Sequence, residues 1–144
     1  MMLLLLVLTS QEWTQWRGPA RDGVVPAAQV PAAWPKELKS KWKVAVGGGY
    51  STPVVAAGAV FLHSRSGESE TVSRFSLASG KLEWTKSYPA VFNKNSYAKA
   101  MSKGPFSTPV VREGRLYTLG VTAILSVWDV RTGCLLYTSP SPRD

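Results

Sequence analysis

The sequence predicts an all-β fold made of short antiparallel strands, and an internal repeat is the main reason. The segment STPVV occurs at Ser51–Val55 and again at Ser107–Val111, an offset of 56 residues. Two further pairs of segments match in register: 58–61 with 114–117 at the same offset, and 75–80 with 128–133 at an offset of 53. A repeat of this length indicates one supersecondary unit that is used more than once.

The first unit contains the pattern of four strands. Phe75 and Leu77 share one face at a period of two residues, and Pro53 suits the first residues of a strand. Gly58 and Gly80 provide positive φ angles for tight turns. The expected strands are Pro53–Ala56, Val60–His63, Val72–Leu77 and one that begins at Leu82.

The second unit repeats this pattern with strands expected at Leu116–Leu119 and Ile124–Val130. Asp129 precedes a turn that ends at Gly133, and its carboxylate is expected to bond the N–H groups of that turn. Four short antiparallel strands at this period describe a propeller blade. The sequence therefore predicts a β-propeller fragment, with one complete four-stranded blade and part of a second, each an antiparallel meander.

Several segments resemble proteins with pyrroloquinoline-quinone-like (PQQ-like) β-propeller repeats. QWRGPARDGV (15–24) resembles their N-terminal signature, and STPVVAAGAVF, FSLASGKLEW and STPVVREGRLY resemble their blade motif. The fuller motif is Leu-Asp-Ala-x-Thr-Gly-Lys-x-x-Trp, so Ser76 stands where it has Asp, and Cys134 stands where it has Lys. The resemblance implies that the N-terminal segment completes the last blade, with Trp42–Val46 as the ring-closing strand and Trp42 equivalent to Trp84.

The last residues, CLLYTSPSPRD (134–144), interrupt the repeat in the middle of a hairpin. One reverse translation of these eleven residues matches the adapter of a transposase-based sequencing library. We therefore expect 134–144 to be translated adapter, and Cys134 to carry no redox meaning. A genuine Pro/Ser-rich tail is the alternative.

The start of the chain predicts export. Met1–Leu8 is an apolar run far shorter than the roughly 18 to 20 residues that span a bilayer, and it fits the apolar core of a secretory signal. A short buried strand is the alternative. We expect a periplasmic or secreted protein without a stable membrane anchor. The expected segments are a truncated signal peptide (1–10), an N-terminal lead with the ring-closing strand (11–50), a blade (51–88), an inter-blade insertion (89–106), a partial second blade (107–133) and the adapter-derived tail (134–144).

The chain carries a net charge of +8, which permits an anionic partner but is also typical of a solvated lysine-rich face. Its aromatic residues are not spaced as a stacking platform on the basic stretches, so we expect no nucleic-acid partner. His63 could serve as a base, but no nucleophile or carboxylate partner is identifiable by spacing, and we interpret it as a strand-end hydrogen-bonding residue. Gly47–Gly49 lacks the Lys-Ser/Thr of a phosphate loop and is interpreted as a flexible lead.

No His/Cys/Asp/Glu set has metal-ligand spacing, and we assign no catalytic, cofactor-binding or metal-binding residue. Meander topology places the loop at Ser64–Thr71 on the same face as the connection 85–106. That connection is long, with 22 residues between Trp84 and Ser107. It contains aromatic, amide and lysine side chains suited to a polysaccharide, an anionic ligand or a protein, namely Tyr88, Phe92, Asn93, Lys94, Asn95, Tyr97, Lys99 and Lys103. A surface loop that packs on the next blade is the alternative.

We expect a non-catalytic binding or scaffold module for proteins or polysaccharide. The alternative that the resemblance implies is a fragment of a quinoprotein alcohol or sugar dehydrogenase that uses pyrroloquinoline quinone and calcium. Such enzymes use an adjacent cysteine pair, a stacking Trp and acidic or amide calcium ligands, so further blades would have to provide that site.

Overall fold

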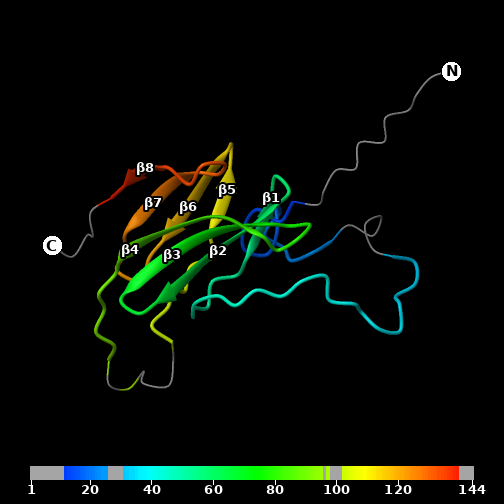
Figure 1. Ribbon diagram of the computed structural model, residues 1–144, viewed down its shortest axis with the longest axis horizontal. Coiled ribbons are helices and arrows are strands. Elements are labelled where there is room, and N and C mark those ends of the chain that lie inside the picture. The colour runs from blue at the N-terminus through cyan, green and yellow to red at the C-terminus, as the bar shows by residue number, and fades with distance from the viewer. Residues whose placement is uncertain (1–11, 26–30, 96, 98–101, 140–144) are drawn as a thin grey trace.

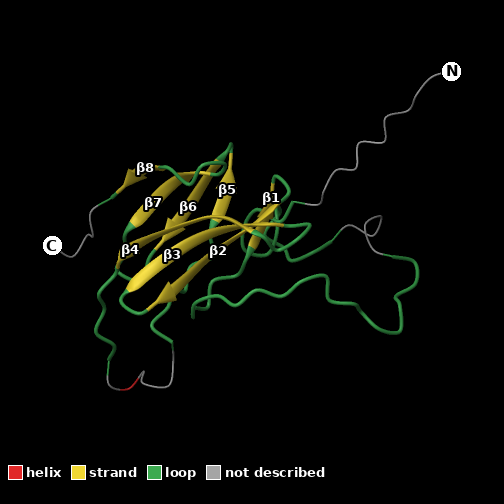
Figure 2. Ribbon diagram, viewed as in Figure 1, coloured by secondary structure: helices red, strands yellow, loops and turns green. Residues whose placement is uncertain are grey.

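The computed structural model describes residues 12–25, 31–95, 97 and 102–139, and it contains two four-stranded antiparallel sheets (Figure 1). Each sheet is a meander, with strand orders β1-β2-β3-β4 and β5-β6-β7-β8. Turns join the strands within each sheet, and the described residues of the lead before β1, 12–25 and 31–50, are also loop (Figure 2). The strands are β1 (Val54–Ala56), β2 (Ala59–Ser66), β3 (Ser69–Ser76), β4 (Leu82–Pro89), β5 (Val110–Arg112), β6 (Arg115–Leu119), β7 (Leu125–Asp129) and β8 (Leu135–Thr138).

The β2–β3 hairpin is longer than the sequence suggested. Ser66 pairs with Ser69, so only Gly67 and Glu68 form the turn, and most of the loop expected at 64–71 is strand. β4 follows β3 along its whole length and ends at Pro89, which pairs with Ser69. The expected connection 85–106 therefore begins at residue 90, because backbone pairing continues well beyond the apolar positions that marked these strands.

The second sheet repeats the turns of the first. Ala57-Gly58 and Glu113-Gly114 all have positive φ, which gives both first hairpins the two-residue turn that matches strand twist. Asp129 accepts hydrogen bonds from the N–H groups of Arg131 (3.1 Å) and Thr132 (2.8 Å), as expected.

The second sheet has a fourth strand, β8, within the segment expected to be adapter-derived. All four of its residues are exposed, and it pairs with β7 in the manner of β4 with β3. Backbone pairing is available to almost any sequence, and through it β8 continues the second meander past Gly133. Residues 140–144 lie outside the described part of the chain.

The two sheets pack face to face, and β1 lies next to β5 (Figure 1). The core lies between them and consists of Val54, Ala56, Ala59, Phe61, Val72, Leu116, Trp128 and Val130. Side chains of β2 and β3 alternate between this core and the opposite face of the first sheet, as strand geometry requires. The all-β propeller-fragment fold is confirmed: two adjacent blade-like meanders share one buried seam.

Two tryptophans make the same contact one repeat apart. Trp42 Nε1 donates to the carbonyl of Leu77 (3.0 Å), and its ring covers Gly80. Trp84 Nε1 donates to the carbonyl of Val130 (3.1 Å), and its ring covers Gly133. Both glycines have positive φ and would bring a Cβ within 2.8 Å of the indole, so each contact requires glycine. The expected equivalence of Trp42 and Trp84 is confirmed by these contacts.

The lead contacts the first sheet at two places. Trp13 forms a backbone bridge with Val55 on the outer edge of β1, and Gly48 forms one with Arg65. Residues 42–46 form no strand in this structure. Their role in closing a propeller ring stays a prediction. The expected signal segment, residues 1–10, lies outside the described residues. Within the described residues, no helix is long and apolar enough to cross a membrane.

Candidate functional site

The end of the sheets that carries the β2–β3 turn also carries the connection between the sheets. We call this end the loop face and define it as residues 48–50, the turn 67–68 and the described residues of 90–106. Glu68 accepts the N–H of Ala90 through its carbonyl (2.9 Å) and binds Lys103 Nζ through its carboxylate (2.9 Å). The expectation that the 64–71 region and the connection share a face is therefore confirmed.

Arg65 links the start of the connection to the β2–β3 turn. Its side chain is 96% buried; Nε donates to the carbonyl of Gly67 (2.9 Å), and one Nη donates to the carbonyl of Ala90 (2.7 Å). Hydrogen bonds to charged groups are among the stronger ones in proteins, so this arginine fixes the turn to the connection. The pKa of Glu68 lies below its ordinary value, chiefly because of the hydrogen bond from Lys103.

An aromatic pair lies at the other end of the connection. Tyr50 and Phe106 stack with ring centroids 5.2 Å apart and planes 3° from parallel, and each is about half exposed. Tyr50 also accepts the N–H of Ser102 through its hydroxyl (3.0 Å), and its own N–H donates to the carbonyl of Pro105 (2.8 Å). These two aromatics precede the two STPVV copies at the same offset of 56, a signal that the sequence analysis did not use.

Between these attachments, the loop face presents apolar and aromatic groups to solvent. Tyr97 is 98% exposed and Val91 is 70% exposed. Asn95 accepts the N–H of Tyr97 through its side-chain oxygen (3.1 Å), a local turn that positions the tyrosine. Of the lysines expected here, Lys94 and Lys103 lie on this loop, and Lys99 lies outside the described residues.

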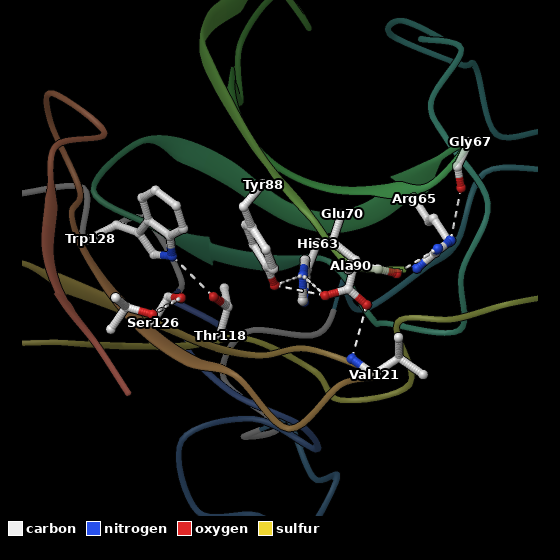
Figure 3. Close-up of polar contacts among 11 residues, drawn as sticks. His63, Arg65, Gly67, Glu70, Tyr88, Ala90, Thr118, Val121, Ser126 and Trp128 are labelled. Atoms are coloured by element: carbon white, nitrogen blue, oxygen red, sulfur yellow. Dashed lines mark hydrogen bonds and ion pairs between the residues drawn. The ribbon is translucent and has the colours of Figure 1, made fainter. Parts of the chain in front are cut away.

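A buried polar cluster lies directly below the loop face, in the seam between the sheets (Figure 3). It joins His63 of β2, Glu70 of β3 and Tyr88 of β4, and the first two are at most 1% exposed. The Tyr88 hydroxyl lies 2.7 Å from Glu70 Oε2 and 3.1 Å from His63 Nε2, and His63 Nε2 lies 3.4 Å from Glu70 Oε2. The second sheet contributes the N–H of Val121, which donates to Glu70 Oε1 (2.9 Å).

The hydrogen-bond directions follow from the number of donors. The single hydroxyl hydrogen of Tyr88 goes to Glu70, because the carboxylate can only accept. His63 Nε2 must then be the donor, to the Tyr88 oxygen at 3.1 Å and to the more distant Glu70 Oε2 at 3.4 Å. This assigns the hydrogen to Nε2 and leaves the buried Nδ1 without a partner among the described residues.

Hydrogen bonding also decides the charge of the cluster. Burial alone would raise the pKa of Glu70, but the hydrogen bonds from His63, Val121 and Tyr88 outweigh it and leave the pKa below its ordinary value. Burial, reinforced by the adjacent carboxylate, raises the pKa of Tyr88 well above its ordinary value. The cluster at neutral pH therefore contains a charged Glu70 and a protonated Tyr88.

Gly120 closes the cluster from the second sheet. A Cβ at this position would overlap Glu70 Oε2 and lie 2.9 Å from the Tyr88 hydroxyl, so only glycine lets the β6–β7 loop approach. Nearby, Trp128 Nε1 donates to Thr118 Oγ1 (3.0 Å), which pairs two further buried polar groups of the seam (Figure 3). A substrate cannot reach Glu70 or His63 without separating the sheets.

The structure changes the interpretation of two sequence features. His63 is a hydrogen-bonding residue, as expected, but it lies within β2 instead of at a strand end, and Glu70 is the carboxylate partner that spacing did not reveal. Gly47–Gly49 is not simply a flexible lead: Gly48 pairs with Arg65, and a Cβ on Gly47 would overlap the Arg65 carbonyl oxygen.

The residues present do not fit pyrroloquinoline quinone and calcium. Among residues 12–25, 31–95, 97 and 102–139, no three His, Cys, Asp or Glu side chains gather to hold a metal ion. Both carboxylate oxygens of Glu70 are occupied by protein donors, and the sequence contains one cysteine, so it offers no adjacent pair.

Comparisons with known proteins find likeness among solved structures. No protein-family model matches the chain, and no curated protein matches it. Among solved structures it is similar to a europium-containing methanol dehydrogenase, with 20% sequence identity and a TM-score of 0.47. The match covers 66% of this chain and 16% of that chain, so the chain spans less than a fifth of the enzyme's length.

Proposed function

We propose that the chain is part of an exported PQQ-like β-propeller repeat protein and serves as a non-catalytic binding or scaffold module for polysaccharide or protein. The repeat, the N-terminal signature and the duplicated tryptophan–glycine contact support the family. The apolar start of the sequence supports export to the periplasm or beyond. Of the two ligand classes, polysaccharide is the one that the loop face supports better.

One observation carries this proposal: aromatic groups are exposed on a loop whose ends are fixed to the sheets. Arg65, Glu68 and Tyr50 hold the connection at both ends, while Tyr97 and the Tyr50–Phe106 pair stay open to solvent. Rigid aromatic side chains bind at low entropic cost, and their flat faces suit the apolar faces of sugar rings. The sealed His63–Glu70–Tyr88 cluster offers no accessible reactive group, which favours binding over catalysis at this end.

Affinity gel electrophoresis tests the proposal. The 144-residue chain is run through native gels that contain dextran, a neutral polysaccharide, or alginate, an anionic one. We expect at least one to retard the chain, and Tyr97→Ala to weaken retardation about fivefold, or about 1 kcal/mol. Trp34→Ala is the matched control, because Trp34 is 66% exposed on the lead, outside the loop face. Equal retardation of the chain and Tyr97→Ala, or none in either gel, would refute a polysaccharide role for the loop face.

A further inference from the structure

A cavity of about 310 Å³ lies at the end of the molecule opposite to the loop face. The segment 12–25 forms one wall, and β5 forms the other; Figure 1 shows this segment in blue beside β1. Glu12 of the segment accepts the N–H of Ala57, in the β1–β2 turn, which places the segment at the far end of the sheet from the turn 67–68. The lining residues are Thr14, Gln15, Arg21, Val110, Val111 and Arg112.

Backbone hydrogen bonds hold both walls. Trp13 pairs with Val55 in both directions (2.8 and 2.9 Å), and the N–H of Val111 donates to the carbonyl of Thr14 (2.8 Å). The segment thus covers the edges of β1 and β5 together. Within it, Gly23 N–H donates to the Arg17 carbonyl (2.9 Å), which closes a compact loop around Arg21. The cavity is therefore built by fixed backbone on both sides.

Two arginines from different elements line this cavity. Arg21 Nε donates to Gln15 Oε1 (2.9 Å), and Gln15 is itself held through a bond from Nε2 to the Pro19 carbonyl (2.8 Å). Arg112 Nε lies 3.3 Å from the carboxylate of Glu113. In both cases the Nε is engaged, while the structure shows no bond from the terminal Nη groups to any described residue. No carboxylate is among the lining residues.

We propose that this cavity binds a tetrahedral oxyanion, phosphate or sulfate, between the guanidinium groups of Arg21 and Arg112. Guanidinium groups present paired N–H donors that match the oxygens of such anions, and the Thr14 hydroxyl adds a donor at the wall. The volume is at the lower end of the range for small-ligand sites, which suits one such group or its ester. Glu113 neutralises part of the charge at the rim, but two arginines leave the cavity positive.

Isothermal titration calorimetry of the 144-residue chain with sodium phosphate, and separately with sodium sulfate, tests this site. Sodium chloride holds the ionic strength constant. We expect saturable one-site binding with a Kd of about 1 mM or tighter for at least one anion. Arg21→Gln and Arg112→Gln should each weaken it at least about tenfold, which corresponds to about 1.4 kcal/mol. The stronger of the two anions identifies the group.

Arg115→Gln is the matched control. Arg115 pairs directly with Arg112 across β5 and β6 but does not line the cavity, and its loss changes the net charge equally. We expect its Kd to equal that of the unmodified chain. Equal weakening by all three variants would show general charge attraction and overturn the proposal, as would the absence of saturable heat. Far-UV circular dichroism verifies that each variant is folded. Tyr97→Ala should leave anion binding unchanged, so this site and the polysaccharide role can fail separately.

Discussion

Replacing Glu70 tests whether the buried cluster stabilises the seam between the sheets. Glu70→Ala leaves the N–H of Val121 without its acceptor, and an unpaired buried donor costs about 1–3 kcal/mol. The Tyr88 hydroxyl loses its acceptor as well, but it can turn to His63 Nε2, 3.1 Å away, if that ring shifts its hydrogen to Nδ1. One donor is therefore orphaned and one is poorly satisfied, so we expect a loss of about 2–4 kcal/mol in the free energy of unfolding.

Glu70→Gln separates hydrogen bonding from charge. The amide oxygen can still accept from Val121, and the amide nitrogen can donate to the Tyr88 oxygen, so we expect a loss of only about 1–2 kcal/mol at pH 7. The pKa of Glu70 lies below its ordinary value of 4.5 in the folded chain. Its ionised form therefore stabilises the fold above the unfolded pKa, and this contribution disappears as the pH falls through the folded pKa. The stability difference between the chain and Glu70→Gln should shrink from about pH 5 downward.

Urea unfolding followed by tryptophan fluorescence measures these differences, at pH 7 and at steps down to about pH 3. Glu113→Ala is the control, because Glu113 is 77% exposed and should change stability very little. A loss below about 1 kcal/mol for Glu70→Ala would show that Val121 and Tyr88 are satisfied by other groups. A pH-independent difference between the chain and Glu70→Gln would refute the charged state assigned to Glu70.

Two further substitutions test the repeat. Gly80→Ala should lower the free energy of unfolding by about 1–3 kcal/mol more than Gly58→Ala does. Both glycines have φ near +70°, but only a Cβ at Gly80 would meet an indole, that of Trp42, at 2.7 Å. Equal urea midpoints for the two variants would disprove the Trp42 contact. Ser76→Asp should stabilise the chain by about 0.5–1 kcal/mol, because it restores in the first repeat the turn hydrogen bonds that Asp129 makes in the second. An unchanged or lower thermal midpoint for Ser76→Asp would contradict this equivalence.

The repeat made the fold predictable from the sequence. The two STPVV copies place β1 and β5, and Gly80 and Gly133 mark turns that the structure contains. The strand ends were less predictable, because β2, β3 and β4 continue into polar residues such as Ser66 and Ser69 that pair through the backbone alone. Apolar periodicity carries no information about those positions.

The polar cluster was missed for a related reason. His63 and Glu70 belong to a hairpin whose turn, Gly67-Glu68, lies in a stretch interpreted as a longer loop. Once Ser66 pairs with Ser69, His63 and Glu70 share one face of neighbouring strands, and Tyr88 joins them from β4. The Val121 N–H could not be predicted, because its position depends on the packing of one sheet on the other.

The seam between the sheets has an apolar part and a polar part, and the difference between them explains why the charged Glu70 is buried there. Around Phe61 and Leu116 the contact is apolar and tolerates small shifts in register between two similar sheets. Glu70 tolerates none, since its carboxylate is satisfied only when Val121 N–H and the small Gly120 stand opposite. We infer that the cluster fixes the register of the two sheets, at a cost in desolvation that apolar packing would avoid. Arg65 lies on the same face of β2 as His63 and donates a hydrogen bond to the carbonyl of Ala90. When the cluster fixes the register of the two sheets, it therefore also fixes the start of the connection. The position of the aromatic groups of the loop face follows from that.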